Sequence, residues 1–227
     1  MCDLDLPVDA ADICIDGRYT SYLAQADDIV IFSTSFSALQ RKVDRLAHWC
    51  SVNFMAINVV KTLAMIFGPL LSVTPVLRVF GSPIAWTSKY TYIGVSLCST
   101  TRYIFQPHYS MKALQARDCA NVAFTVDSMT GLVPPWEGTR LYMARVDPHL
   151  IHGCDVILDI DAGSLTDLEL LQCKYIRRLL GVSTRCSRVF LFTETGLVPL
   201  NYRRVLLSLG FLAYALAQPP ERLVHLP

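Results

Sequence analysis

Two β-like runs on either side of a pair of adjacent aspartates constrain the fold of this chain more than any other feature. The runs are Arg18 to Ala24 and Ile29 to Ser33, and the second is rich in β-branched and aromatic residues, which favours a buried strand. The polar break Gln25-Ala26-Asp27-Asp28 between them predicts a β-hairpin with both aspartates at its tip. Asp-Asp is an unusual turn pair, because neither residue takes a left-handed conformation freely. Local conflicts of this kind tend to mark functional sites.

A helix is expected after the hairpin. Ser37 and Gln40 are spaced as a capping box, and apolar residues then recur at steps of three and four. This stripe consists of Phe36, Leu39, Val43, Leu46, Cys50 and Phe54. The other faces of the helix carry Arg41, Lys42, Asp44, Arg45 and His48.

The remaining β-like segments of the first hundred residues are short. We expect a strand at Lys61 to Phe67, a hairpin from Val76 to Trp86 around a Gly81-Ser82 turn, and a strand at Lys89 to Leu97 with Gly94 inside it.

Beyond about residue 103 the periodicity becomes helical. Ser164 and Asp167 are spaced as the cap of one helix, and Gly181 is expected to end it. The four expected helices are Ser110 to Val126, Trp136 to Val146, Leu165 to Leu180 and Tyr202 to Ala217. The predicted class is α+β, with a mixed part over residues 1–100 and a helical part over residues 101–227.

The composition limits the classes of function that this chain could have. With 52% hydrophobic and 17% charged residues, the 227-residue chain can bury a core. A net charge of +1 gives no global basic field, so contact with nucleic acid would need local basic patches. Neither a signal peptide nor a membrane-spanning run is present, since Ser208 and Gly210 interrupt the longest apolar run, Val205 to Ala217. We therefore expect a cytosolic or nuclear protein with no membrane partner, whose eight dispersed cysteines are free thiols.

Adjacent carboxylates at a hairpin tip can bind a hard cation such as Mg²⁺. A phosphoryl-transfer site usually requires two metals, and hence at least one further carboxylate from a neighbouring strand. A solvated acidic turn has the same local pattern, so Asp27 and Asp28 alone leave both interpretations open.

The segment from Leu23 to Ser33 resembles the metal-binding hairpin of reverse transcriptases, whose core reads aromatic-x-Asp-Asp. Downstream, Asn58 to Met65 resembles the Asn-x-x-Lys-Thr-x-x-Met segment of LINE-type (non-LTR) elements, and Tyr92-Ile93-Gly94-Val95 is similar to the Tyr-Leu-Gly strand at the base of the palm. Three later segments resemble fungal members of the group. They are Pro134 to Gly138, Ala144 to Leu150 and Phe192 to Leu197.

This resemblance implies a partial palm over residues 1–100 and a helical thumb or connector beyond it. It implies that Asp27 binds a metal and Asp28 supports it, with Mg²⁺ as the cofactor if the site is completed. Lys61 would act near the phosphates of the incoming nucleotide, and Tyr92 and Gly94 would belong to the strand that steadies the primer end. The implied partners are an RNA template and a DNA primer.

The sequence also departs from the family. Reverse transcriptases carry another catalytic aspartate on an earlier palm strand, and none of Asp3, Asp5, Asp9, Asp12 and Asp16 has a buried β-run around it. Position 25 is Gln where most members have Tyr or Phe. We therefore expect a reverse-transcriptase-like fragment that is inactive alone, with an exposed palm surface that favours self-association.

Two other interpretations remain open: a non-catalytic nucleic-acid or partner-binding module, and an unstable truncated product. The first would use basic helix faces, with Lys174, Arg177 and Arg178 as the main candidates. Arg140, Arg145, Arg203 and Arg204 are expected on solvated faces. His149, His152 and Cys154 lack a fourth ligand for zinc, and Asp155, Asp159 and Asp161 are expected in a short strand or loop with one wet face.

Overall fold

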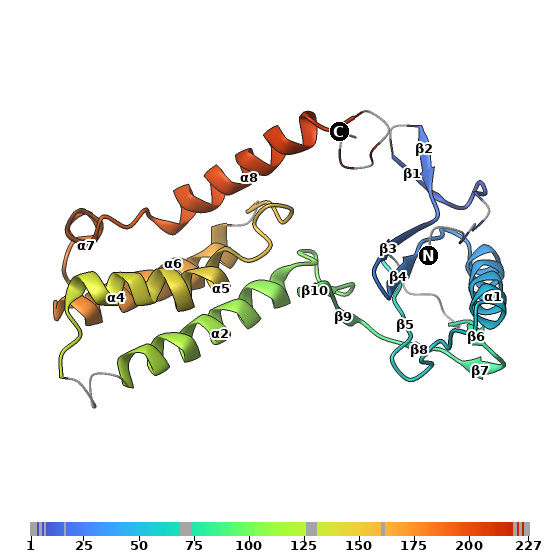
Figure 1. The fold of residues 1–227 in the computed structure, drawn as a ribbon, viewed down its shortest axis with the longest axis horizontal. Helices are drawn as coiled ribbons and strands as arrows, with labels where there is room; N and C mark the ends of the chain where they lie inside the picture. Colours follow the sequence, from blue (N-terminus) through green and yellow to red (C-terminus); the bar gives the residue numbers. More distant parts are fainter. Residues whose placement is uncertain are drawn as a thin grey trace. The chain divides into compact units, whose positions relative to one another are not determined.

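The computed structural model describes residues 4, 6, 8–15, 17–68, 74–125, 131–159, 162–219, 222 and 224. It mixes helices and two-stranded sheets, as the sequence predicts (Figure 1). The chain divides into two compact units, Met1–Ser88 with Pro220–Pro227, and Lys89–Pro219. This boundary lies before the predicted one at residue 100, because residues 89–98 pack with the helical unit.

The predicted aspartate hairpin is confirmed. Strand β3 (Tyr22–Gln25) pairs antiparallel with β4 (Asp28–Ile31), and Gln25 lies opposite Asp28. The two-residue loop is Ala26-Asp27, and Ala26 has a φ of 53°. Asp28 therefore begins a strand and does not share the turn with Asp27, so Ala26 and not an aspartate adopts the left-handed conformation.

Ser21 divides the run from Arg18 to Ala24 into two strands. Its hydroxyl donates a hydrogen bond of 2.6 Å to the buried carboxylate of Asp12. The residues before Ser21 form β2 (Arg18–Thr20), which pairs with β1 (Ile13–Ile15). A single strand was expected because the hydrogen bond to Asp12 leaves no local signature.

Helix α1 (Phe36–Val52) follows the hairpin, as expected, but it begins differently. Its N-cap residue is Ser35, and the side chain of Gln40 binds Asp44 and the carbonyl of Arg78. The predicted capping box of Ser37 and Gln40 is therefore wrong.

Lys42 lies off the apolar stripe of α1, as expected, yet it is buried. Its side chain is 1% exposed and forms an ion pair with Asp12, whose side chain is 0% exposed. The same ammonium donates to the carbonyl of Phe32 at 3.0 Å. Lys42 thus ties α1 to the segment before β1 and to the end of β4.

The rest of the first unit is built from very short strands. Strand β5 (Leu63–Ala64) pairs in parallel with β8 (Ala85–Trp86), and β6 (Arg78–Val79) forms a hairpin with β7 (Ser82–Pro83). The predicted strand from Lys61 to Phe67 is thus reduced to two residues, and the turn is Phe80-Gly81. The core of this unit consists of Val43, Ala47, Ala64, Leu77, Val79 and Ile84.

The second unit begins with a hairpin where one strand was predicted. Strand β9 (Lys89–Tyr92) pairs with β10 (Val95–Cys98) around Ile93-Gly94, whose φ angles are 47° and 75°. Two successive residues with positive φ form the tight turn that matches the twist of two antiparallel strands. Gly94 is therefore a turn residue and does not lie inside a strand.

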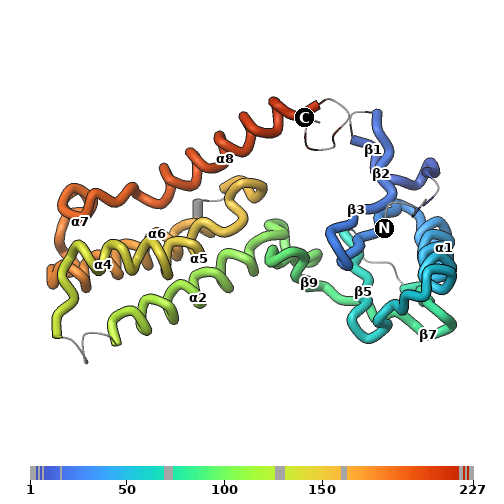
Figure 2. The backbone as a smooth tube through the Cα atoms, in the orientation of Figure 1, coloured from blue at the N-terminus to red at the C-terminus, as the bar shows by residue number. Residues whose placement is uncertain are grey.

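Helices pack side by side in the rest of this unit (Figures 1 and 2). A continuous helical stretch replaces the expected Trp136 to Val146 helix and contains a π-helical segment, η1. The elements are α2 (Gln106–Thr125), α4 (Pro135–Leu141), η1 (Tyr142–Val146), α5 (Asp147–Ile151), α6 (Ala162–Leu180), α7 (Arg188–Thr195) and α8 (Leu200–Leu216).

Helix α6 matches its prediction at one end only. Gly181 follows it with a φ of 65°, as a helix-ending glycine should. Its start at Ala162 places Ser164 and Asp167 inside the helix, so the predicted cap is wrong. The helix buries one apolar stripe in the main core, which consists of Leu165, Leu168, Tyr175 and Leu179.

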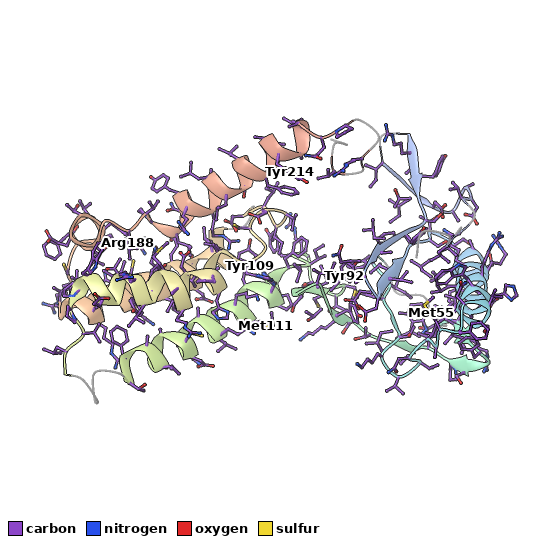
Figure 3. The ribbon with its side chains drawn as sticks, in the orientation of Figure 1. Met55, Tyr92, Tyr109, Met111, Arg188 and Tyr214 are labelled. Carbon is purple, nitrogen blue, oxygen red and sulfur yellow. The ribbon has the colours of Figure 1, made fainter. Side chains whose placement is uncertain are left out.

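Arg204 occupies the interior of the helical unit. It is 1% exposed, and its guanidinium binds both carboxylate oxygens of Asp159 at 2.8 Å and the carbonyl of Leu150 at 2.6 Å. The hydroxyl of Tyr109, labelled in Figure 3, donates to the same carboxylate. Burial and the Asp159 carboxylate raise the pKa of the Tyr109 hydroxyl, which keeps it protonated and a donor.

Arg203 is bound as well, through two hydrogen bonds to the buried Asp147 at 2.8 and 3.1 Å. The expectation that Arg203 and Arg204 lie on a solvated face is therefore wrong. Asp159 lies in a loop, as one of the two predicted alternatives had it, but it is not on a wet face, because its carboxylate binds Arg204 and Tyr109.

All seven cysteines in the described part of the chain are free thiols, as predicted; Cys2 lies outside the described residues. Within the described ranges, no helix is both long and apolar enough to cross a bilayer.

Arg204→Met should lower the free energy of unfolding by about 3–5 kcal/mol, because it leaves the Asp159 carboxylate with a buried and unpaired charge. Arg188→Met is the control and should cost less, since Arg188 and its partner Glu169 are 55% and 24% exposed. Urea denaturation of both variants measures the difference. Equal losses of unfolding free energy in the two variants would contradict the conclusion that Arg204 is central to the helical unit.

Gly94→Ala should cost about 1–2 kcal/mol, because an alanine at this φ is strained. Gly81→Ala is a matched control, since Gly81 has a φ of 77° at the same turn position with open space around it. A Cβ at Gly94 would lie 2.8 Å from Nε2 of His152. Both variants should lose similar stability, but only Gly94→Ala should shift the His152 ring resonances in an NMR spectrum.

Candidate functional site

The paired aspartates occupy the exposed tip of the β3–β4 hairpin. Asp27 lies in the two-residue loop, Asp28 begins β4, and both side chains are exposed. No described residue forms a hydrogen bond or ion pair with either carboxylate, so their oxygens are available to an external ligand. Gln25, which replaces the aromatic residue of the family pattern, is exposed opposite Asp28.

These two carboxylates do not by themselves fit a two-metal centre. Within the described residues, no group of three or more His, Cys, Asp or Glu side chains gathers closely enough to hold a metal ion. Asp12 is already paired with Lys42, and Asp9 binds Arg41 at 3.1 Å. Asp3, Asp5 and Asp16 lie outside the described residues.

Lys61 lies in an exposed turn before β5. Its backbone N–H donates to the side-chain oxygen of Asn58 at 3.1 Å, and the hydroxyl of Thr62 donates to the Asn58 carbonyl at 2.9 Å. Asn58 thus shapes the turn that presents Lys61. In the part of the chain that the structure describes, no hydrogen bond or ion pair joins Lys61 to Asp27 or Asp28, and β5 belongs to a different sheet from β3 and β4.

Tyr92 and Gly94 belong to the helical unit. Tyr92, labelled in Figure 3, is the last residue of β9 and pairs with Val95. Gly94 follows in the turn, close to His152. The aspartate hairpin belongs to the other unit.

The three basic candidate residues of α6 lie in two different environments. Arg177 is half-buried and donates to the carbonyl of Cys186 at 3.2 Å, which ties it to the loop after α6. Lys174 and Arg178 are exposed on the other side and line one groove. The guanidinium of Arg178 stacks 4.2 Å above the ring of Phe124 from α2.

This groove lies between α2 and α6 and has a volume of about 610 Å³. Arg117 adds a third cation to it from α2, and Asp167 is its one acidic residue. The lining residues are Ser110, Ala113, Leu114, Arg117, Ala120, Asn121, Phe124, Asp167, Leu170, Leu171, Lys174, Tyr175 and Arg178.

Arg117, Asn121 and Phe124 were missed in the sequence. They recur at steps of four and three on α2, so they share a helix face, but nothing local shows which helix that face meets. Only the packing of α2 on α6 brings them beside Lys174 and Arg178.

The zinc alternative finds no support in the geometry. His149 contacts Cys119 at 3.3 Å, while the thiol of Cys154 is buried and lies 3.8 Å from Asp155. Burial raises the pKa of the Cys154 thiol to about 11, which keeps it protonated and a poor ligand near neutral pH.

Comparison with known proteins adds no relative: no family model, no curated protein and no solved structure matches the chain.

Proposed function

We propose that this chain carries the paired-aspartate hairpin of a reverse-transcriptase-like protein, and that this hairpin supplies part of a two-metal site for nucleotidyl transfer. One observation carries the proposal: Asp27 and Asp28 lie exposed at the tip of a regular hairpin and no described residue binds either carboxylate. The resemblance of Leu23 to Ser33 to the family hairpin supports the same assignment.

Under this proposal the described residues are not a complete enzyme. Two metals about 3.5–4 Å apart need more carboxylate ligands than one hairpin tip provides. Asp9 and Asp12 are bound to Arg41 and Lys42, so they are not available as the missing ligand. The remaining carboxylate, and the residues that select a nucleotide, would have to come from another segment or chain.

A metal titration tests the hairpin directly. Mn²⁺ should broaden the amide resonances of residues 25–29 at roughly millimolar concentration, because two carboxylates without further ligands bind a divalent ion weakly. Asp27→Asn with Asp28→Asn should abolish this broadening, whereas Asp118→Asn, an exposed aspartate on α2, should leave it intact. Mg²⁺-dependent primer extension by the chain alone should be undetectable. Broadening that survives the double substitution would contradict the proposed ligands.

A second function is favoured by the α2–α6 groove, namely binding of single-stranded nucleic acid. Arg117, Lys174 and Arg178 bring three cations together in a chain whose net charge is only +1. Phe124 is 6% exposed beneath the guanidinium of Arg178, so it positions this cation and presents no free ring face to a base. A groove lined by cations can follow the phosphate backbone of a single strand without sequence preference.

Lys174→Ala with Arg178→Ala should weaken binding of a single-stranded oligonucleotide. The slope of the logarithm of the association constant against the logarithm of salt should fall by about 1.4, at roughly 0.7 for each phosphate that the variant no longer neutralises. Fluorescence anisotropy at several salt concentrations measures the slope. Arg140→Ala, which removes an exposed arginine paired with Glu137 outside the groove, is the control and should leave it unchanged. An unaltered slope in the double variant would reject this groove.

A further inference from the structure

Helix α2 presents a second polar face, opposite the groove. His108, Lys112 and Cys119 are spaced by four and seven residues, which places them in one stripe on the helix. Arg117 and Asn121, which line the groove, lie on the other side of the same helix. The stripe is largely buried: His108 is 2% and Lys112 is 9% exposed.

Helix α5 and the residue after it bring two more histidines to this stripe. Nε2 of His149 lies 3.3 Å from the thiol of Cys119, and the ring of His152 lies 5.7 Å from that of His108 between centroids. The β9–β10 turn closes one side, where Gly94 meets Nε2 of His152. Three elements thus gather three imidazoles on the face of α2 that carries the buried Lys112.

His108 has no capacity left for a ligand. Its Nδ1 accepts from the backbone N–H of Ser96 at 3.4 Å, and its Nε2 therefore donates to the carbonyl of His152 at 3.1 Å. Lys112 differs, because no described residue accepts a hydrogen bond from its ammonium or pairs with it. His149 also keeps one ring nitrogen without a partner in the described part of the chain.

Charge in the cluster is unbalanced. Burial lowers the pKa of Lys112, and the pKa values of His108, His149 and His152 are lowered first by burial and then by the charge of Lys112. Arg204 acts on His108 in the same direction. Asp155 is the acidic group that acts on His152, and it forms no ion pair with any described residue. A largely buried ammonium without a bound anion is unfavourable.

We propose that Lys112, His149 and His152 form a binding site for a phosphate-like oxyanion. The ammonium supplies the fixed charge, and the ring nitrogen of His149 that does not face Cys119 supplies an N–H donor. The His152 ring already hydrogen-bonds the backbone of Gly94, so it supplies a further donor in its imidazolium form. A divalent cation is disfavoured in the same place, because Lys112 would repel it. The site reaches solvent through His152, which is exposed, and His149, which is half-buried.

The anion has two chemical sources. Inorganic phosphate and the phosphate of a nucleic-acid strand present the same oxygens to these donors. This site does not depend on the α2–α6 groove or on the aspartate hairpin, since it shares no residue with either.

Histidine side-chain NMR of the full chain tests the proposal, with inorganic phosphate as the first probe and ionic strength held constant with NaCl. Bound phosphate should raise the pKa of His149 and His152, because an anion stabilises the imidazolium form. The resonances of His48, an exposed residue of α1, should not move. Lys112→Met should weaken phosphate binding by about tenfold or more. Lys174→Met, in the groove, should leave it unchanged.

Lys112→Met keeps most of the buried stem, so the variant should fold, and thermal unfolding checks this. In the absence of phosphate, Lys112→Met should also raise the pKa of His149 and His152, because the positive charge of Lys112 is removed. This change does not require any ligand. An oligonucleotide with a 5′-phosphate, compared with its 5′-hydroxyl form, then identifies the source. A response to the 5′-phosphate at lower concentration than to inorganic phosphate assigns a strand terminus, and an equal response assigns free phosphate. If neither probe moves the His149 and His152 resonances, the site is rejected.

Discussion

The bidentate ion pair between Arg204 and Asp159 orients the helical unit. Through one guanidinium, α8 is joined to the end of α5, to the loop before α6 and, by way of Tyr109, to α2. Apolar contacts alone would allow each helix to be buried in several orientations about its axis. The five N–H donors of the planar Arg204 guanidinium are satisfied in only one arrangement of their partners. In the first unit, Lys42 and Asp12 join α1 to the segment before β1 in the same manner. Each unit therefore has a buried charge pair whose members lie far apart in sequence.

These pairs also mark the limit of what could be predicted. The aspartate hairpin and the end of α6 at Gly181 follow from patterns within a dozen residues, and the structure has them. The burial of Lys42 and Arg204 does not follow from such patterns, because lysine and arginine usually are exposed and their partners lie 30 and 45 residues away. Among the candidate residues, Asp27 lies in the predicted turn and Asp28 begins the second strand beside it. Arg117, by contrast, comes to lie beside Lys174 only through the packing of α2 on α6.

Helix α2 connects the two candidate binding regions of the second unit. One face forms the groove with α6, and the opposite face forms the histidine and lysine cluster with α5. Both faces carry positive charge, yet their surroundings differ. The groove cations are exposed and bind through screened attraction, whereas Lys112 is enclosed and would act on a single anion at short range. A single helix can thus present a broad surface for a strand on one side and a confined site on the other.

The π-helical segment η1 takes up one extra residue in this helical stretch. The backbone N–H of Asp147 donates to the carbonyl of Tyr142, five residues earlier, so η1 holds one residue more than an α-helical turn would. Because the wider turn absorbs this residue locally, α5 keeps the face that a regular helix one residue shorter would give it. A deletion within η1 would therefore leave His149 facing Cys119 and Asp147 facing Arg203. A deletion in the regular part of α4, with η1 unchanged, would instead turn α5 by about 100° and separate both pairs.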